Sequence, residues 1–168
     1  MREITPYELR DNVFKMIDKD WMLVTASDRE GKAFNTMTAS WGGMGILWGK
    51  PVAFVFIRPQ RYTYEFTEQS DRMTLSFFGG EQKNALKICG TKSGRDCDKI
   101  KEAGLTPVNV GEGLYSFEEA TAVVQCRKIY ADTVKKENML DMSIMKNYQN
   151  NDFHKLYVCE IEKITVKE

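Results

Sequence analysis

Apolar and polar residues alternate along this chain in short runs, and the runs predict more strands than helices. Residues 21–28 and 32–41 flank an Arg-Glu-Gly tripeptide and predict a β-hairpin with Gly31 in its turn. Because strands follow one another directly, we expect a mainly β fold, an antiparallel barrel rather than a βαβ series. Further apolar or alternating runs predict strands at 51–58, 72–78, 118–134 and 154–167.

Helical signals are fewer and shorter. Thr5 as cap, Pro6 in the first turn and Glu8 form a capping box, and an apolar stripe predicts that this first helix runs to about Asp18. Gly90 is expected to form a left-handed cap at the end of a later helix. Other helices are predicted at 61–69, 81–90, 96–104 and the Met-rich stretch 137–151. They would pack outside the barrel, and residues 1–168 are interpreted as a single domain.

The charges of the chain balance, with 24 Lys and Arg against 24 Asp and Glu. A net charge of zero offers no field that would attract nucleic acid or an anionic membrane, so a small molecule or another protein is the expected partner. The first residues are too charged for a signal peptide, and the longest apolar run, Val52–Ile57, is too short to span a bilayer. We therefore expect a cytoplasmic protein.

Several common kinds of chemistry are excluded by the motifs that are missing. The 4 cysteines form no CxxC pair and there is 1 histidine, so no metal site is expected. A phosphate loop would need glycine at Met44 and Ser or Thr at Pro51, and Trp48 breaks a GxGxxG pattern. No GxSxG motif accompanies His154, for which we expect a structural or surface role.

Residues 34–45 combine hydroxyl side chains, glycines and a tryptophan. Strand alternation would place Thr36, Thr38 and Ser40 on one face, next to Trp41. Such a face is either the solvent side of an edge strand or the wall of a ligand site. In the same way, Trp41 either contacts a ligand or caps the barrel core.

The polar groups that remain suit a flat, amphipathic and phosphorylated ligand. Hydroxyls and backbone amides pair with polar ring edges, an indole covers a ring face, and arginines bind phosphate. FMN is a molecule of this kind. Arg58 and Arg61 flank a Pro-Gln turn and either bind such a phosphate or are solvated, while Trp48 is expected to cap the core.

Four stretches carry a resemblance to a known family, in the same order along nearly the whole chain. They are NTMTASW (35–41), KPVAFVFIRPQRYTYEF (50–66), SGRDCDKIKEAGLTP (93–107) and HKLYVCEI (154–161). Together they resemble the flavin reductase-like family with the FMN-binding split barrel, in its flavoredoxin branch. The resemblance implies a split β-barrel with peripheral α-helices that forms a homodimer, with FMN at or near the subunit interface.

The family pattern also implies which residues bind the cofactor. The flavin would be lined by Asn35, Thr36, Thr38, Ala39, Ser40 and Trp41. The ribityl phosphate would be approached by Arg58, Arg61, Tyr62 and Thr63, with either arginine closest. A later loop and short helix would add Ser93, Gly94 and Lys99, where Lys99 either meets an anion or is an ordinary surface lysine. The chain departs from many reductases of the family at Cys159, where they have glycine.

The resemblance implies an FMN-binding oxidoreductase that passes electrons between NAD(P)H or a reduced ferredoxin-like carrier and a flavin or protein acceptor. The cofactor would supply the chemistry, so no catalytic acid, base or nucleophile is needed. Two alternatives stay open: a flavoredoxin-type electron carrier with permanently bound FMN and no nicotinamide site, and a non-enzymatic flavin-binding module. We expect Met139, Met142 and Met145, spaced as on a helix, to serve packing rather than a cofactor.

Overall fold

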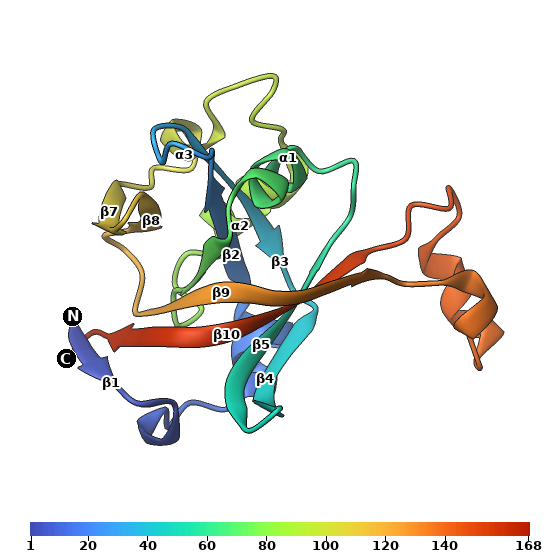
Figure 1. The fold of residues 1–168 in the computed structure, drawn as a ribbon. Coiled ribbons are helices and arrows are strands. Elements are labelled where there is room, and N and C mark those ends of the chain that lie inside the picture. The colour runs from blue at the N-terminus through green and yellow to red at the C-terminus, as the bar shows by residue number, and fades with distance from the viewer.

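A computed structural model describes all of residues 1–168, and it shows a mainly antiparallel β fold with a few short helices (Figure 1). The strands are β1 (Arg2–Ile4), β2 (Met22–Ser27), β3 (Phe34–Ala39), β4 (Gly42–Leu47), β5 (Lys50–Ile57), β6 (Arg72–Phe77), β7 (Pro107–Gly111), β8 (Leu114–Phe117), β9 (Ala122–Thr133) and β10 (Lys155–Val166). The α-helices are α1 (Tyr62–Gln69), α2 (Lys83–Thr91) and α3 (Lys99–Glu102). Shorter helical segments are the 3₁₀ turns Pro6–Glu8, Lys136–Asn138 and Met142–Asn147 and the π-helix Lys15–Asp20.

One sheet organises the molecule. Its strands follow the order β3-β2-β6-β9-β10-β5-β4, β1 pairs with the end of β10, and every pairing is antiparallel. The long strands β9 and β10 cross the middle of the molecule, and α1 and α2 lie beside β2 and β3 (Figure 1). The expected antiparallel sheet with helices outside it is confirmed, as is the hairpin turning at Gly31.

Strand β2 is buried on both of its faces, which explains its nearly continuous apolar sequence. Met22 and Val24 belong to the larger core cluster enclosed by the sheet. Leu23, pointing the other way, belongs to a second cluster together with Leu86 and Cys89 of α2. The second cluster fixes α2 against the outer face of the sheet, next to β3.

The expected helix from Thr5 to Asp18 is wrong. The capping box does form, with the Thr5 amide donating to Glu8 Oε2 over 2.7 Å, but it closes only one 3₁₀ turn. Helical structure resumes near the π-helix Lys15–Asp20, where Asn12 Oδ1 accepts from the Lys15 amide. The helix is therefore interrupted between these two segments, and β1, a strand not predicted, precedes the first of them.

The Met-rich stretch is not the expected helix either. Residues 134–154, here called the arm, connect β9 to β10 and project away from the body (Figure 1). Within the arm there are only two 3₁₀ segments, and Leu140, Met142 and Ile144 are exposed. Much of their apolar surface is therefore not covered by the chain itself.

Two further expectations are corrected. Gly90 lies inside the last turn of α2 rather than in a left-handed cap, and it packs against Thr38. Trp48 does not cap the core: it lies in the β4–β5 turn, φ 52°, with 61% of its surface exposed. The β4 strand and the separate β7–β8 hairpin were not predicted. None of the helices has the length and hydrophobicity that crossing a membrane requires.

Candidate functional site

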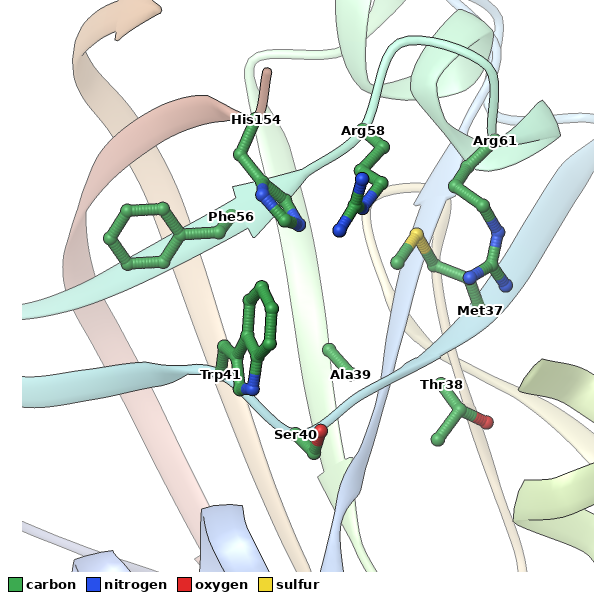
Figure 2. Close-up of a pocket in the computed structure, with 9 residues that line it drawn as sticks. All are labelled: Met37, Thr38, Ala39, Ser40, Trp41, Phe56, Arg58, Arg61 and His154. Carbon is green, nitrogen blue, oxygen red and sulfur yellow. The ribbon is translucent and has the colours of Figure 1, made fainter. Parts of the chain in front are cut away.

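A pocket of about 170 Å³ opens where the ends of β3 and β5 meet the base of the arm (Figure 2). Figure 2 shows the side chains of His154, Arg58 and Trp41 directed toward a shared space. The lining residues are Met37, Thr38, Ala39, Ser40, Trp41, Phe56, Arg58, Arg61 and His154. Six of the predicted cofactor residues thus lie around this first pocket: Thr38, Ala39, Ser40, Trp41, Arg58 and Arg61.

The glycine after Trp41 lets the chain turn tightly beside this pocket. Gly42 starts β4 with φ 150° and pairs with Val55 of β5. A Cβ atom at Gly42 would lie 2.7 Å from the carbonyl oxygen of Phe54, a contact that no side chain tolerates. The close approach places Trp41 at the pocket with 47% of its surface exposed, so its indole is available to a ligand.

The threonine hydroxyls of β3 form hydrogen bonds to neighbouring elements of the fold. Thr36 is fully buried, and its hydroxyl bonds to Thr25 Oγ1 at 2.9 Å and to the Val24 carbonyl at 3.2 Å. The Thr38 hydroxyl donates to the Leu86 carbonyl of α2 over 2.5 Å. The solvent-face alternative is therefore wrong for Thr36, because the helices cover that side of the strand.

A second pocket, of about 520 Å³, lies on the other side of Arg61 between the start of β3, α1 and the loop before α3. Four predicted cofactor residues line it: Asn35, Tyr62, Gly94 and Lys99. Asn35 is held there by Thr63, whose hydroxyl accepts from its Nδ2 over 2.7 Å. Gly94 is required by close packing, since a Cβ atom there would lie 2.3 Å from Asn35 Oδ1.

Two positive side chains meet between the pockets. Arg61 Nη2 and Lys99 Nζ both donate to the carbonyl oxygen of Cys89, over 3.4 Å and 3.1 Å. Neither has a carboxylate within salt-bridge distance, although Lys99 is only 3% exposed. Burial lowers the pKa of Arg61 and lowers the pKa of Lys99 to about 8. Two poorly solvated cations without a counter-ion form a site that favours an anion.

Arg58 differs from Arg61 in having its charge compensated. Its guanidinium forms an ion pair with Asp152 and donates to the carbonyl of Asn147 over 2.8 Å. It also lies over the ring of Tyr148, 5.2 Å from the centroid. Arg58 therefore ties β5 to the base of the arm, and Arg61 is the arginine left available for an anion.

His154, expected to have a structural or surface role, is buried and lines the first pocket. Its Nδ1 is 2.8 Å from the hydroxyl of Tyr148, and its ring centroid is 5.3 Å from that of Trp41. Burial is the main cause that lowers the pKa of His154 to about 4, with a smaller contribution from the positive charge of Arg58. The imidazole is accordingly neutral at pH 7.

The remaining predicted residues lie outside both pockets. Thr36 is buried and its hydroxyl bonds to β2, whereas Thr63 is buried and holds Asn35 of β3. The Ser93 hydroxyl accepts from the Arg95 amide over 3.2 Å and so shapes the loop before α3. Cys159, where the sequence departs from many reductases, is fully buried in the larger core cluster and touches neither pocket.

Solved structures resemble this fold over nearly the whole chain. The FMN-binding protein from Thermus thermophilus with bound p-hydroxybenzaldehyde is 23% identical, with a TM-score of 0.67 over 100% of this chain and 83% of that one. Flavoredoxin of Desulfovibrio vulgaris (Miyazaki F) is 20% identical, with a TM-score of 0.68 over 98% of this chain and 78% of that one. The flavin reductase of styrene monooxygenase from Pseudomonas putida S12 is 18% identical, with a TM-score of 0.62 over 89% and 80%.

These likenesses establish the split-barrel fold that the sequence predicts. No curated protein sequence matches the chain. The model of the flavin reductase like domain matches residues 17–168, which include both pockets. The chain therefore belongs to the flavin reductase-like family.

Proposed function

We propose that this protein is an FMN-binding oxidoreductase that passes electrons between NAD(P)H or a reduced ferredoxin-like carrier and a flavin or protein acceptor. The observation that carries the proposal is the pair of cations, Arg61 and Lys99, between two pockets and without a carboxylate partner. A phosphate monoester would supply the missing negative charge. The family of the chain points to FMN as the molecule that bears it.

The residues present fit such a cofactor. Arg61 and Lys99 would hold the phosphate, and Trp41 offers an indole face to a flat ring. Ser40 and the backbone amides near it would pair with polar ring atoms. The first pocket is smaller than the roughly 300–1,000 Å³ typical of ligand sites, so a flavin would extend out of it past Trp41.

FMN, when bound, supplies the redox chemistry, since it takes up and releases electrons as hydride or singly. The residues of this chain then have to bind and orient the ring and keep one of its faces accessible. His154 is neutral and Arg58 is ion-paired, so neither is set up to move a proton in the first pocket at pH 7. This agrees with a site that needs no acid or base of its own.

We also propose that the protein forms a homodimer through the arm. Leu140 is completely exposed, and Met142 and Ile144 beside it are 58% and 41% exposed. Each copy also has an apolar cavity of about 340 Å³ next to the first pocket, lined in part by Phe14, Trp41 and Met44. The arm of a second copy could cover this cavity. Within one chain the exposed side chains Leu140, Met142 and Ile144 do not line this cavity, so exchange between two copies would cover both apolar surfaces.

The electron donor is tested by anaerobic reduction of the FMN-loaded protein. The flavin absorption should be lost within minutes when NADH or NADPH is added in slight excess. Loss of absorption with a reduced ferredoxin but with neither nucleotide would identify an electron carrier of the flavoredoxin type. If none of these donors bleaches bound FMN, the protein is a flavin-binding module and the oxidoreductase proposal is wrong.

A further inference from the structure

The chain has one histidine, and the two nitrogens of its ring lie in different surroundings. We propose that Tyr148 holds His154 in the neutral tautomer that carries its hydrogen on Nε2, and that this Nε2–H is the donor which the first pocket offers to an acceptor atom of its ligand. Tyr148 is a positioning residue in this account, because it acts through His154. The identification of the ligand as FMN rests on the function proposed above. The assignment of the tautomer is independent of that function.

The tautomer follows from the hydrogen bond at Nδ1. The Tyr148 hydroxyl lies 2.8 Å from Nδ1, and it has no other protein partner. A tyrosine hydroxyl has a single hydrogen, and Tyr148 is buried, so donating that hydrogen to the Nδ1 lone pair satisfies both groups. The opposite arrangement would leave the hydroxyl hydrogen with no protein acceptor. In a neutral ring, the imidazole hydrogen is therefore on Nε2.

The second nitrogen is free and accessible. Nε2 makes no hydrogen bond within the protein, yet no buried side-chain nitrogen or oxygen is left without a partner. Nε2 is consequently open to the pocket that His154 lines, and Figure 2 shows the ring directed toward Trp41 and Arg58. A donor in this position can exchange its contact with water for an acceptor atom of a ligand.

Aromatic rings fix the orientation of the imidazole. Trp41 lies 5.3 Å from it at an interplanar angle of 55°, and Phe56 meets it edge-on at 6.3 Å. Tyr148 is itself fixed between the Arg58 guanidinium and the ring of Phe153, which stacks on it at 4.9 Å. The arm thus reaches the first pocket through its last residue, His154, which Tyr148 supports, and rotation of the imidazole would disrupt these contacts.

Burial is the main reason that the His154 ring is neutral, and the charged groups near it add to this effect. Arg58 from the end of β5 disfavours a second positive charge, and Asp152 only partly offsets it because it is already paired with Arg58. Arg61 lines the same pocket and adds positive charge there. The Tyr148 pKa is raised, mainly by burial, so the hydroxyl keeps its hydrogen at neutral pH. A neutral donor suits an uncharged acceptor such as a ring carbonyl.

The test is long-range ¹H–¹⁵N NMR of the full-length protein, in which the only imidazole signals come from His154. Without ligand at pH 7, we expect Nε2 to be protonated and Nδ1 to be the unprotonated nitrogen. Tyr148→Phe keeps the ring under Arg58 and should convert the signals to a mixture of tautomers. The exposed Tyr7 provides the control, since Tyr7→Phe should change nothing. A hydrogen on Nδ1 in the wild type, or one tautomer retained in Tyr148→Phe, would overturn the proposal.

A second readout tests the donor itself. Addition of FMN should shift the Nε2–H resonance; FMN that binds without moving this signal refutes the role of His154 while leaving the proposed function intact. His154→Gln places an amide NH₂ near the position of Nε2, whereas His154→Asn reaches only as far as Nδ1. FMN affinity should fall roughly threefold to tenfold in His154→Asn and stay closer to wild type in His154→Gln. Equal losses in the two variants would contradict a donor at Nε2.

Discussion

Arg61 and Lys99, from opposite ends of a 39-residue stretch of sequence, donate to the same carbonyl oxygen, that of Cys89 in α2. The shared acceptor holds two positive charges close together, although charges of like sign repel each other. No carboxylate of the chain offsets them. Two cations without a carboxylate favour a bound anion, which is why the pair carries the proposed function.

Loss of either cation should weaken binding of FMN much more than binding of riboflavin, which lacks the phosphate. We expect Arg61→Gln and Lys99→Met each to reduce FMN affinity by roughly 10- to 100-fold, the value of a charge-assisted hydrogen bond. Titration followed by flavin fluorescence measures both ligands. Lys92→Met is the control, because Lys92 is already paired with Glu102. An equal loss for riboflavin would mean that the variants damage the pocket rather than a phosphate site.

The same site should respond to pH. Lys99, with a pKa of about 8 in the free protein, is charged below that pH and neutral above it. The phosphate of FMN, whose second pKa is about 6, is a dianion throughout the range from 7 to 9.5. FMN affinity should therefore fall as the pH rises through this range, while riboflavin affinity stays nearly constant. Lys99→Met should flatten the FMN profile; a wild-type profile that is already flat contradicts the assignment.

Stability in weak acid should depend on His154. Its pKa is about 4 in the folded chain and about 6.5 when unfolded, so between these values the unfolded chain takes up a proton that the folded chain does not. The free energy of unfolding should thus fall by about 3 kcal/mol as the pH drops from 7 to below 4. Urea denaturation of the wild type and of His154→Gln isolates the contribution of His154 to the free energy of unfolding, because the carboxylates titrate equally in both proteins. If the free energy of unfolding changes with pH in the same way in both proteins, the folded chain also binds a proton at His154, which contradicts the prediction.

Close packing at Gly94 gives a further prediction. In Gly94→Ala, the methyl group would meet Asn35 Oδ1 and disturb its bond to Thr63. We expect the free energy of unfolding to fall by about 1–3 kcal/mol, as measured by urea denaturation. Gly45→Ala, where no atom lies within 4 Å of the added methyl, should stay within about 0.5 kcal/mol of wild type. Similar values for the two variants would mean that Asn35 moves aside at no cost.

The arm should control the oligomeric state. Replacing Leu140, Met142 and Ile144 by serine should convert a dimer to a monomer, as measured by light scattering during size-exclusion chromatography. The three side chains make up an exposed apolar surface, so the substitutions should not unfold the monomer. Tyr7→Ser is the control at another exposed site. A wild-type chain that is monomeric at micromolar concentration contradicts the homodimer.

Local patterns in the sequence were enough to predict the β2–β3 hairpin, the capping box and the strands β5, β6, β9 and β10, because each depends on residues close together in the chain. The break between the 3₁₀ turn Pro6–Glu8 and the π-helix Lys15–Asp20 could not be predicted, because the apolar stripe of the sequence runs through it. Trp48 looked like a core residue by its size alone, and only the position of the β4–β5 turn exposes it.

The candidate site was predictable where consecutive residues build it, as from Thr38 to Trp41. The choice between Arg58 and Arg61 was not, because it depends on Asp152, 94 positions after Arg58. His154 was missed for the same reason: the fold brings it to Trp41, and a lone histidine has no local pattern to mark it. The contact between Lys99 and Cys89 likewise exists only once α3 packs on α2.

The central claim is that this chain binds FMN through its phosphate. Its most direct test is equilibrium binding of FMN and of riboflavin to the full-length protein at pH 7, after any flavin that copurifies has been removed. We predict saturable binding of one FMN per chain, at least tenfold tighter than riboflavin. Equal affinity for the two, or no binding of FMN at all, would contradict the account.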